Sequence, residues 1–392
     1  MKLIFASDSF KGSLSSAQTA QILERAAREV FNDAARYGEL QCASVVVADG
    51  GEGTTDAVVQ ATGGEPIDVD VHGPLMEPVA ARYGIFGTDG AIVETAAASG
   101  LTRVPQNLRN PLYTTTYGTG ELLRDALDRG RRNICLAIGG SATNDGGMGC
   151  ARALGVRFLD ADGRELEGRG EDLERVRDVD ASGLDPRIAD ASIVVMCDVT
   201  NPLCGENGAT RTFGPQKGAT PEIVERLEAG MRNYRDVIRE TFGVDPDALR
   251  GGGAAGGLGT AATVFLKGTM RSGIDAVLDL VNFDALLEDA DLVVTGEGRT
   301  DWQSCFGKVM QGIGERARRA GVPAVGLSGS LGKDACAIFE HGIESLATTV
   351  DAPMSLDEAM ERAEELYYLG AMRMFRVLRA GMTMADRRRL DD

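Results

Sequence analysis

The sequence predicts an α/β protein with two domains, and three observations lead to that prediction. The chain has 392 residues, which is longer than one hydrophobic core usually supports. Short apolar runs alternate with glycine-rich turns and helical segments, as in proteins built on parallel sheets. Between Glu65 and Glu94 this alternation gives way to short strand-like runs separated by turn signals, so a different domain is expected to begin there.

The composition is that of a globular, strongly acidic protein. Hydrophobic residues make up 43% of the chain, and the formal net charge is −18. This charge makes nucleic acids and anionic membranes poor general partners. The seven cysteines include no C-x-x-C pair, which argues against a zinc site or a disulfide framework. No apolar run approaches the ~20 residues of a membrane span and no signal peptide is recognised, so a cytoplasmic location is expected.

Polar residues follow the first predicted strand, Lys2 to Ala6. Asp8, Ser9 and Lys11 come directly after this strand, and a helical segment follows them. Ligands of α/β proteins bind at the carboxyl ends of the strands. We therefore expect these three side chains to belong to a binding site, although Lys11 could equally be a solvated loop residue.

A second predicted strand, residues 43–48, leads into a loop with two carboxylates. Asp49 and Glu52 stand three residues apart among Gly50, Gly51 and Gly53. This spacing suggests a site for a metal or a hydroxyl group. Glu52 could instead stabilise the positive end of the following helix.

A loop with five glycines, residues 139–149, lies between the apolar run 134–138 and a helical segment. At such a junction, backbone N–H groups and the helix dipole converge on a point where an anion can bind. The loop also carries a hydroxyl, an amide and a carboxylate at Ser141, Asn144 and Asp145. It is a candidate phosphate-binding loop.

Two further strands end in acidic loops. Asp198 follows the predicted strand 192–197, a position typical of a catalytic base or a magnesium ligand. The predicted strand 291–295 leads into Gly296–Asp301, which contains Glu297 and Arg299. A long amphipathic helix is expected from Pro221 to Thr241, and the segment from Leu356 to Met384 is also expected to be helical.

A dinucleotide-binding fingerprint is formally present at Gly251, Gly253 and Gly256. The fingerprint requires a preceding strand, but residues 245–250 are polar and turn-like. We interpret this segment as a glycine turn at the start of a helix.

Taken together, the candidate residues are suited to phosphoryl transfer. Neither of the two histidines, His72 and His341, stands at a strand end. Carboxylates, lysines, an arginine and backbone amides remain, and phosphoryl transfer uses this set. The residues alone predict a phosphotransferase acting on a small hydroxylated substrate. A nicotinamide-dependent dehydrogenase and a non-catalytic sugar-acid sensor are the alternatives.

Six motifs, taken together, resemble those of the bacterial glycerate kinase, type 1 family. They are D-S-F-K-G-S at 8–13, A-D-G-G-E-G-T at 48–54, G-G-S-A-T-N-D-G-G at 139–147, C-D-V-T-N-P-L at 197–203, F-G-P-Q-K-G at 213–218 and G-E-G-R at 296–299. The resemblance implies Mg²⁺- and ATP-dependent phosphorylation of D-glycerate at the 2-hydroxyl. Phosphorylation at the 3-hydroxyl, or of another small hydroxy acid, is the alternative.

The resemblance also implies a discontinuous architecture. A Rossmann-like α/β domain would comprise residues 1–68 and 290–392, and a second α/β domain, residues 69–289, would be inserted in it. The active site would lie in the cleft between the two. Nothing in the sequence indicates whether the chain forms a homo-oligomer.

We assign roles to these residues as hypotheses. Asp198 would orient or deprotonate the glycerate hydroxyl, while Lys11 and Arg299 would neutralise the substrate carboxylate and the transferring phosphoryl group. The substrate-binding residues would be Asp8, Ser9, Asp49, Gly50, Gly51, Glu52, Asn201 and Asp301. The nucleotide-binding residues would be Gly139, Gly140, Ser141, Thr143, Asn144, Asp145, Gly146 and Lys217. The metal ligands would be Asp49 and Glu297. The sequence leaves open which loop binds ATP and which binds glycerate.

Two positions depart from the family's motifs. Ser7 stands where a proline is usual, and Thr300-Asp301-Trp302-Gln303 replaces the usual I-D-x-Q. An indole beside the expected site could alter the fit of the substrate, so these departures bear on substrate preference.

Overall fold

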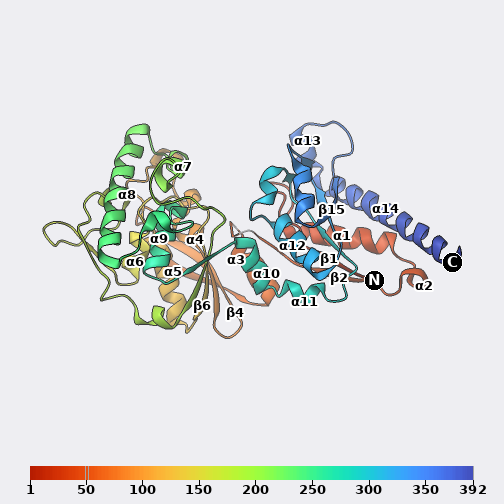
Figure 1. Ribbon diagram of the computed structural model, residues 1–392, viewed down its shortest axis with the longest axis horizontal. Helices are drawn as coiled ribbons and strands as arrows, with labels where there is room; N and C mark the ends of the chain where they lie inside the picture. The colour runs from red at the N-terminus through yellow and green to blue at the C-terminus, as the bar shows by residue number, and fades with distance from the viewer. Residues whose placement is uncertain (49, 52, 392) are drawn as a thin grey trace. The chain divides into compact units, whose positions relative to one another are not determined.

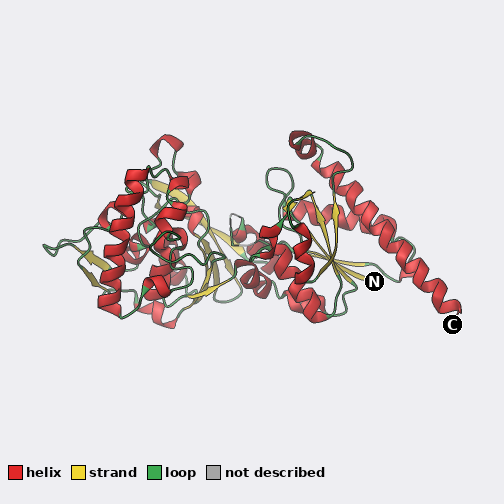
Figure 2. Ribbon diagram, turned by 45° about the horizontal axis from the view of Figure 1, so that its top comes forward, coloured by secondary structure: helices red, strands yellow, loops and turns green. Residues whose placement is uncertain are grey.

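The computed structural model describes residues 1–48, 50–51 and 53–391 (Figure 1). The chain divides into two compact units. Unit 1 comprises Met1–Asp49 and Val277–Asp392, and unit 2 comprises Gly50–Ala276. Both units combine helices with a sheet (Figure 2), as the α/β prediction required.

Unit 1 is built on a parallel five-stranded sheet with the order β15-β13-β11-β1-β2. Its strands are β1 (Lys2–Phe5), β2 (Gln41–Ser44), β11 (Leu292–Thr295), β13 (Ala324–Ser328) and β15 (Ile343–Thr348). Counted along the chain, this is the doubly wound order 2-1-3-4-5, which reverses direction between β1 and β11. Ligands of doubly wound sheets bind at such a reversal, outside the carboxyl ends of the strands.

Alternating strand residues bury the two faces of this sheet. Leu3, Phe5 and Val294 share a core with α1 (Ser16–Val30) and α14 (Ala363–Asp391), which run next to each other (Figure 1). Ile4 and Val293 point the opposite way, and α12 (Val309–Ala320) contacts β11, β13 and β15. The shorter elements of unit 1 are α2 (Ala34–Tyr37), α11 (Phe283–Leu287), β12 (Arg299–Thr300), β14 (Ser330–Leu331) and α13 (Leu356–Glu361).

Unit 2 is built on a mixed six-stranded sheet with the order β10-β9-β6-β5-β4-β3. Its strands are β3 (Glu65–His72), β4 (Pro78–Phe86), β5 (Gly90–Glu94), β6 (Asn133–Ala137), β9 (Ser192–Met196) and β10 (Thr269–Arg271). The last four run parallel, while β3, β4 and β5 pair antiparallel. The short strands β7 (Arg157–Leu159) and β8 (Asp178–Asp180) form a separate antiparallel pair.

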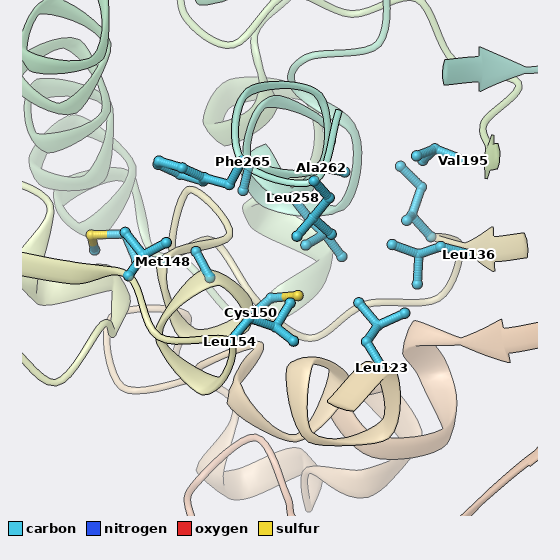
Figure 3. Packing of buried hydrophobic residues seen from close by; sticks show 14 of the residues in the cluster. Leu123, Leu136, Met148, Cys150, Leu154, Val195, Leu258, Ala262 and Phe265 are labelled. Atoms are coloured by element: carbon cyan, nitrogen blue, oxygen red, sulfur yellow. The ribbon is translucent and has the colours of Figure 1, made fainter. Parts of the chain in front are cut away.

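Eight helices accompany this sheet in the described part of the chain. They are α3 (Thr54–Thr62), α4 (Thr95–Ser99), α5 (Tyr117–Asp128), α6 (Met148–Ala153), α7 (Ala209–Phe213), α8 (Pro221–Phe242), α9 (Ala254–Val264) and α10 (Gly273–Leu280). Figure 3 shows how Leu123 of α5, Leu136 of β6, Cys150 of α6 and Leu258 of α9 gather in one buried cluster. Cys150 is buried here among apolar side chains, and burial raises the pKa of its thiol.

The unit boundaries differ from those expected at residues 68/69 and 290. Strand β3 crosses residue 68 and pairs with β4 along its whole length, so the segment from Gly50 onward belongs to unit 2. The other boundary falls within α10. Arg316 of α12 binds Asp279 at 2.6 Å and Asp284 at 2.9 Å, which joins that segment to unit 1. Pairing and ion pairs between distant residues therefore set both boundaries.

Most predicted elements are present, with two differences. Residues 43–48 were expected to form the second strand, but the structure has β2 at Gln41–Ser44, where Lys2 pairs with Gln41. The single helix expected from Leu356 to Met384 is interrupted at Arg362, between α13 and α14. The expected helix at 221–241 is confirmed as α8.

Candidate active site

A cavity of about 1160 Å³ lies in unit 1 beyond the carboxyl ends of its strands. Its walls come from the segments that follow β1, β11, β13 and β15, together with α13 and the start of α14. The lining residues include six that the sequence singled out: Asp8, Ser9, Lys11, Glu297, Arg299 and Asp301. The structure thus brings together residues almost 300 positions apart in the sequence, at the reversal of strand order between β1 and β11.

Backbone hydrogen bonds fasten the loops around this cavity to one another. The N–H of Asp8 donates to the carbonyl of Gly296 at 2.8 Å, and the N–H of Ser330 donates to the carbonyl of Gly298 at 3.1 Å. A Cβ added to Gly296 would lie 2.0 Å from the carbonyl oxygen of Leu327, so only glycine permits this approach. The glycines in this motif therefore allow the loops to pack closely.

Three cations line the unit 1 cavity: Lys11, Arg299 and Lys308. The Arg299 side chain is 67% exposed and lies 3.7 Å from Asp301, a loose surface ion pair worth little energy. Among the residues that the structure describes, no salt bridge joins Lys11 or Lys308 to a carboxylate. These cations are placed to bind an anionic ligand.

Glu297 was expected to bind a metal, and the structure shows it already engaged. Its Oε1 accepts hydrogen bonds from Ser304 Oγ and, at 3.2 Å, from Thr300 Oγ1. The side chain is buried, and burial raises the pKa of its carboxyl group. In the described part of the chain no group of three or more His, Cys, Asp or Glu residues is arranged to hold a metal ion. The metal role of Glu297 remains a prediction.

One wall of the unit 1 cavity was not expected from the sequence. The segment after β15 and the helix α13 contribute a series of apolar side chains: Val350, Ala352, Pro353, Met354, Leu356, Ala359 and Met360. Leu356 is 73% exposed, although it is apolar. A sequence signal was present, because small and apolar residues follow the strand at 343–348 where polar ones are usual.

Both departures from the family's motifs have a place in this unit. Ser7 is buried, and its hydroxyl lies 3.3 Å from that of Tyr367, a cavity residue. Trp302 is 50% exposed and packs edge-on against Phe306, with ring centroids 5.7 Å apart. Its neighbours Asp301 and Gln303 line the cavity, while the indole turns to Phe306.

A second group of candidate residues lies at the carboxyl edge of the parallel strands of unit 2. Asp198 follows β9, is exposed, and accepts a hydrogen bond at 2.9 Å from the N–H of Gly273, where α10 begins. A Cβ added to Gly50 would lie 3.2 Å from Cβ of Met196, and one added to Gly139 would lie 3.3 Å from the carbonyl of Gly50. Three loops therefore meet at this edge. Asp49 and Glu52, both predicted here, lie outside the described residues.

The glycine-rich loop 139–149 is largely buried, and its polar groups bind one another. Asp145 is fully buried and accepts hydrogen bonds from Thr116 N at 2.7 Å, Thr116 Oγ1 at 2.8 Å, Gly147 N at 3.0 Å and Gly149 N at 3.2 Å. Burial raises the pKa of its carboxyl group. Only a part of the expected phosphate-binding surface is thus accessible: Gly139 and Gly140 are exposed, whereas Ser141, Thr143, Asn144 and Gly146 are buried.

Lys217, predicted to bind the nucleotide, is also buried. Its ammonium donates to Ser141 Oγ at 2.9 Å and to the carbonyl of Thr143 at 2.6 Å. Burial lowers the pKa of this lysine to about 8. The Lys217 side chain thus bonds to the buried side of the glycine-rich loop.

Asparagine amides in unit 2 support the turns around these loops. Asn201 donates to the carbonyl of Asn207 at 2.7 Å, and Asn144 donates to Thr210 Oγ1 at 3.0 Å. The glycine cluster that begins at Gly251 follows the short 3₁₀ helix Pro246–Ala248, not a strand. This arrangement agrees with our rejection of a dinucleotide-binding fingerprint.

Comparison with known proteins relates this chain to glycerate kinases. The model of the family described as "Glycerate kinase family" matches residues 3–379. Glycerate 2-kinase of Escherichia coli (strain K12) is 45% identical over 387 residues, covering 98% of this chain and all of that protein. Glycerate kinase of Bacillus subtilis (strain 168) is 46% identical over 367 residues, covering 93% of this chain and 94% of that protein.

A solved structure shares the fold as well. The crystal structure of a protein described as a glycerate kinase 2 from Salmonella typhimurium LT2 superposes with a TM-score of 0.87. It is 44% identical, and the match covers 98% of this chain and 99% of that one. Within the described residues, no helix combines the length and apolar character that crossing a bilayer requires.

Proposed function

Because this chain belongs to the glycerate kinase family, we propose that it transfers the γ-phosphoryl group of ATP to the 2-hydroxyl of D-glycerate, giving 2-phosphoglycerate. The observation that carries this proposal is the family match over residues 3–379, nearly the whole chain. The chemistry of the unit 1 cavity supports it, since cations and carboxylates line the same space. On the grounds of its composition, we also propose a cytoplasmic location.

The cations of the unit 1 cavity have a defined task in this reaction. Phosphoryl transfer is catalysed mainly by positioning and by neutralising charge on the phosphoryl oxygens. Lys11 and Arg299 are exposed on the cavity wall and can reach an anionic ligand without first breaking a strong ion pair. Asp198 would accept the proton of the glycerate hydroxyl. Its Oδ1 accepts a hydrogen bond at 2.9 Å from the N–H of Gly273, which restricts the orientation of the carboxylate.

Mg²⁺ would neutralise negative charge on the phosphate oxygens and hold them in place. In phosphate-transferring sites it commonly takes one or two carboxylates and fills its other positions with phosphate and water. Asp8 and Asp301 line the unit 1 cavity beside the cations and have the right donor chemistry. Each also accepts a backbone N–H at Oδ1. Both are only partly buried, whereas Glu297 is buried, so they are more accessible to a metal ion than Glu297.

A coupled ATP-consumption assay with D-glycerate and Mg²⁺ tests the proposal, with the product identified by NMR. We expect turnover and 2-phosphoglycerate. The formation of 3-phosphoglycerate would retain the kinase and overturn the regiochemistry. No turnover with D-glycerate, but turnover with another small hydroxy acid, would overturn the proposed substrate.

A further inference from the structure

The unit 1 cavity has two chemically different walls. One wall carries the cations Lys11, Arg299 and Lys308 with the hydroxyl groups of Ser9 and Ser330, together with the carboxyl groups of Asp8, Glu297 and Asp301, of which Asp8 and Asp301 are the Mg²⁺ ligands proposed above. The other wall, made by the segment after β15 and by α13, is mainly apolar through Met354, Leu356 and Met360, although Asp351 and Ser355 also belong to it. A ligand that satisfies both walls needs a polyanionic end and a sizeable apolar end.

Of the two substrates of the proposed reaction, only the nucleotide has both ends. Glycerate is a three-carbon hydroxy acid without an apolar part, whereas ATP joins a polyphosphate to a flat aromatic base. The cavity volume, about 1160 Å³, is at or above the ~300–1,000 Å³ typical of pockets for drug-sized ligands. This space is far larger than glycerate requires.

The topology favours the same occupant. The cavity lies where the order of a doubly wound sheet reverses, between β1 and β11, and mononucleotides bind at this point in sheets of order 2-1-3-4-5. The loop first expected to bind phosphate, residues 139–149 of unit 2, has fewer accessible polar side chains. Asp145 and Lys217 are buried there, and both bind groups of the protein itself.

We propose that the unit 1 cavity is the nucleotide site, with the polyphosphate against Lys11, Arg299 and Lys308 and the base against the apolar side chains of α13. This inference rests on the proposed kinase function and specifies which unit binds ATP. It reverses our sequence-based assignment, which gave the nucleotide to the loop 139–147 and gave Asp8, Ser9 and Asp301 to glycerate. This proposal explains why the apolar Leu356 is exposed, because an apolar side chain on a ligand-binding wall is covered when the ligand binds.

Binding measurements on the whole protein separate the two walls. Isothermal titration calorimetry would follow the non-hydrolysable analogue AMP-PNP with Mg²⁺, and D-glycerate in a separate titration. Leu356→Asp should raise the Kd for AMP-PNP roughly three- to tenfold, because a charged group replaces an apolar contact. Lys308→Ala should raise it by at least about tenfold through the lost charge. Neither change should alter the affinity for D-glycerate.

Matched controls lie on the same unit. Val377 of α14 is 72% exposed, almost as much as Leu356, and is not a cavity residue. Val377→Asp should therefore leave the Kd for AMP-PNP unchanged. Arg319→Ala removes an exposed cation from α12 outside the cavity and serves as the control for Lys308→Ala.

The outcomes distinguish this inference from the proposed function. If wild-type protein phosphorylates glycerate while both cavity variants bind AMP-PNP normally, the nucleotide assignment is overturned and the kinase stands. A rise in the Kd for D-glycerate alone would make the cavity the acceptor site and overturn the assignment as well. If wild-type protein neither binds AMP-PNP nor turns over any hydroxy acid, the proposed function itself fails.

Discussion

The ammonium of Lys217 donates to the carbonyl oxygen of Thr143 at 2.6 Å, at a position where both residues are buried. A second bond to Ser141 Oγ joins the same ammonium to the start of the loop. In the described part of the chain no salt bridge joins Lys217 to a carboxylate. A buried charge without an ion-pair partner is costly. The protonation state of Lys217 should therefore affect the stability of the folded protein measurably.

We predict that the contribution of Lys217 to stability increases as the pH rises above about 8. Burial lowers its pKa to about 8 in the folded protein, whereas an unfolded chain's lysine titrates near ~10.4. Between these values the unfolded state binds more protons, so the free energy of unfolding increases with pH. Below this window both states are protonated and the burial cost is fully present.

The measurement compares chemical denaturation of wild type and Lys217→Met between pH 7 and 10. The difference in free energy of unfolding should move in favour of wild type by on the order of 1–3 kcal/mol across the range. All other titrating groups are common to both proteins and cancel. A difference that stays constant with pH would show that Lys217 does not titrate in this window.

Asp145→Asn should destabilise the protein by about 2–4 kcal/mol. The carboxylate accepts hydrogen bonds from two backbone N–H groups of its own loop and from Thr116. In the asparagine variant an NH₂ group replaces one of the two oxygens. This NH₂ group cannot accept a hydrogen bond, so at least one buried donor loses its partner. Thermal or denaturant unfolding measures the loss. Asp190, which is exposed, supplies the control, since Asp190→Asn should change stability by less than about 0.5 kcal/mol. Equal effects of the two substitutions would contradict the structural role of Asp145.

Gly256→Ala should destabilise the protein more than Gly130→Ala. Both glycines have positive φ, +68° and +79°, so both substitutions incur backbone strain. A Cβ at Gly256 would lie 2.1 Å from the carbonyl oxygen of Thr143, whereas one at Gly130 has no neighbour within 4 Å. We expect Gly256→Ala to lower the free energy of unfolding by at least about 1 kcal/mol more than Gly130→Ala does. This difference measures how closely the turn packs on the glycine-rich loop. If the two variants lose the same stability, the contact is not tight in solution.

Asp198→Asn should lower kcat by about 10²–10⁴, the usual contribution of a general base. The amide keeps the shape of the side chain and an oxygen that can accept from Gly273, so the fold and the affinity for AMP-PNP should be retained. Steady-state kinetics with D-glycerate measures the loss. A kcat within about tenfold of wild type would rule out the role of base.

The sequence predicted the carboxyl ends of β1 and β11 well, because strand, glycine turn and helix are local patterns. Asp8, Lys11 and Arg299 were recognised in this way, and the structure places them around one cavity. Which unit each strand joins is not a local property. Strand β3 was divided by the expected boundary at residue 68 because its pairing with β4 depends on contacts that periodicity does not report.

The polar residues of loop 139–149 show the limit of reading a binding site from residue types. Hydroxyl, amide and carboxylate groups beside glycines suit an external phosphate and an internal hydrogen-bond network equally well. The difference lies in burial, which depends on residues far apart in sequence: Asp145 binds Thr116, and Lys217 binds Ser141 and Thr143. The apolar cavity wall at α13 was not predicted, because helical periodicity does not report that Leu356 and Met360 line a cavity.

The discontinuity of unit 1 has a consequence for the growing polypeptide on the ribosome. Strand β1 lies between β2 and β11 in the sheet, but β11 begins only at Leu292. While Gly50–Ala276 is being synthesised, β1 and β2 therefore lack β11, the strand that pairs with β1 in the finished sheet. Since translation adds ~5–20 residues per second, unit 2 has time to fold first, and a nascent chain stalled before Leu292 would expose an unpaired edge of β1 to chaperones or to aggregation.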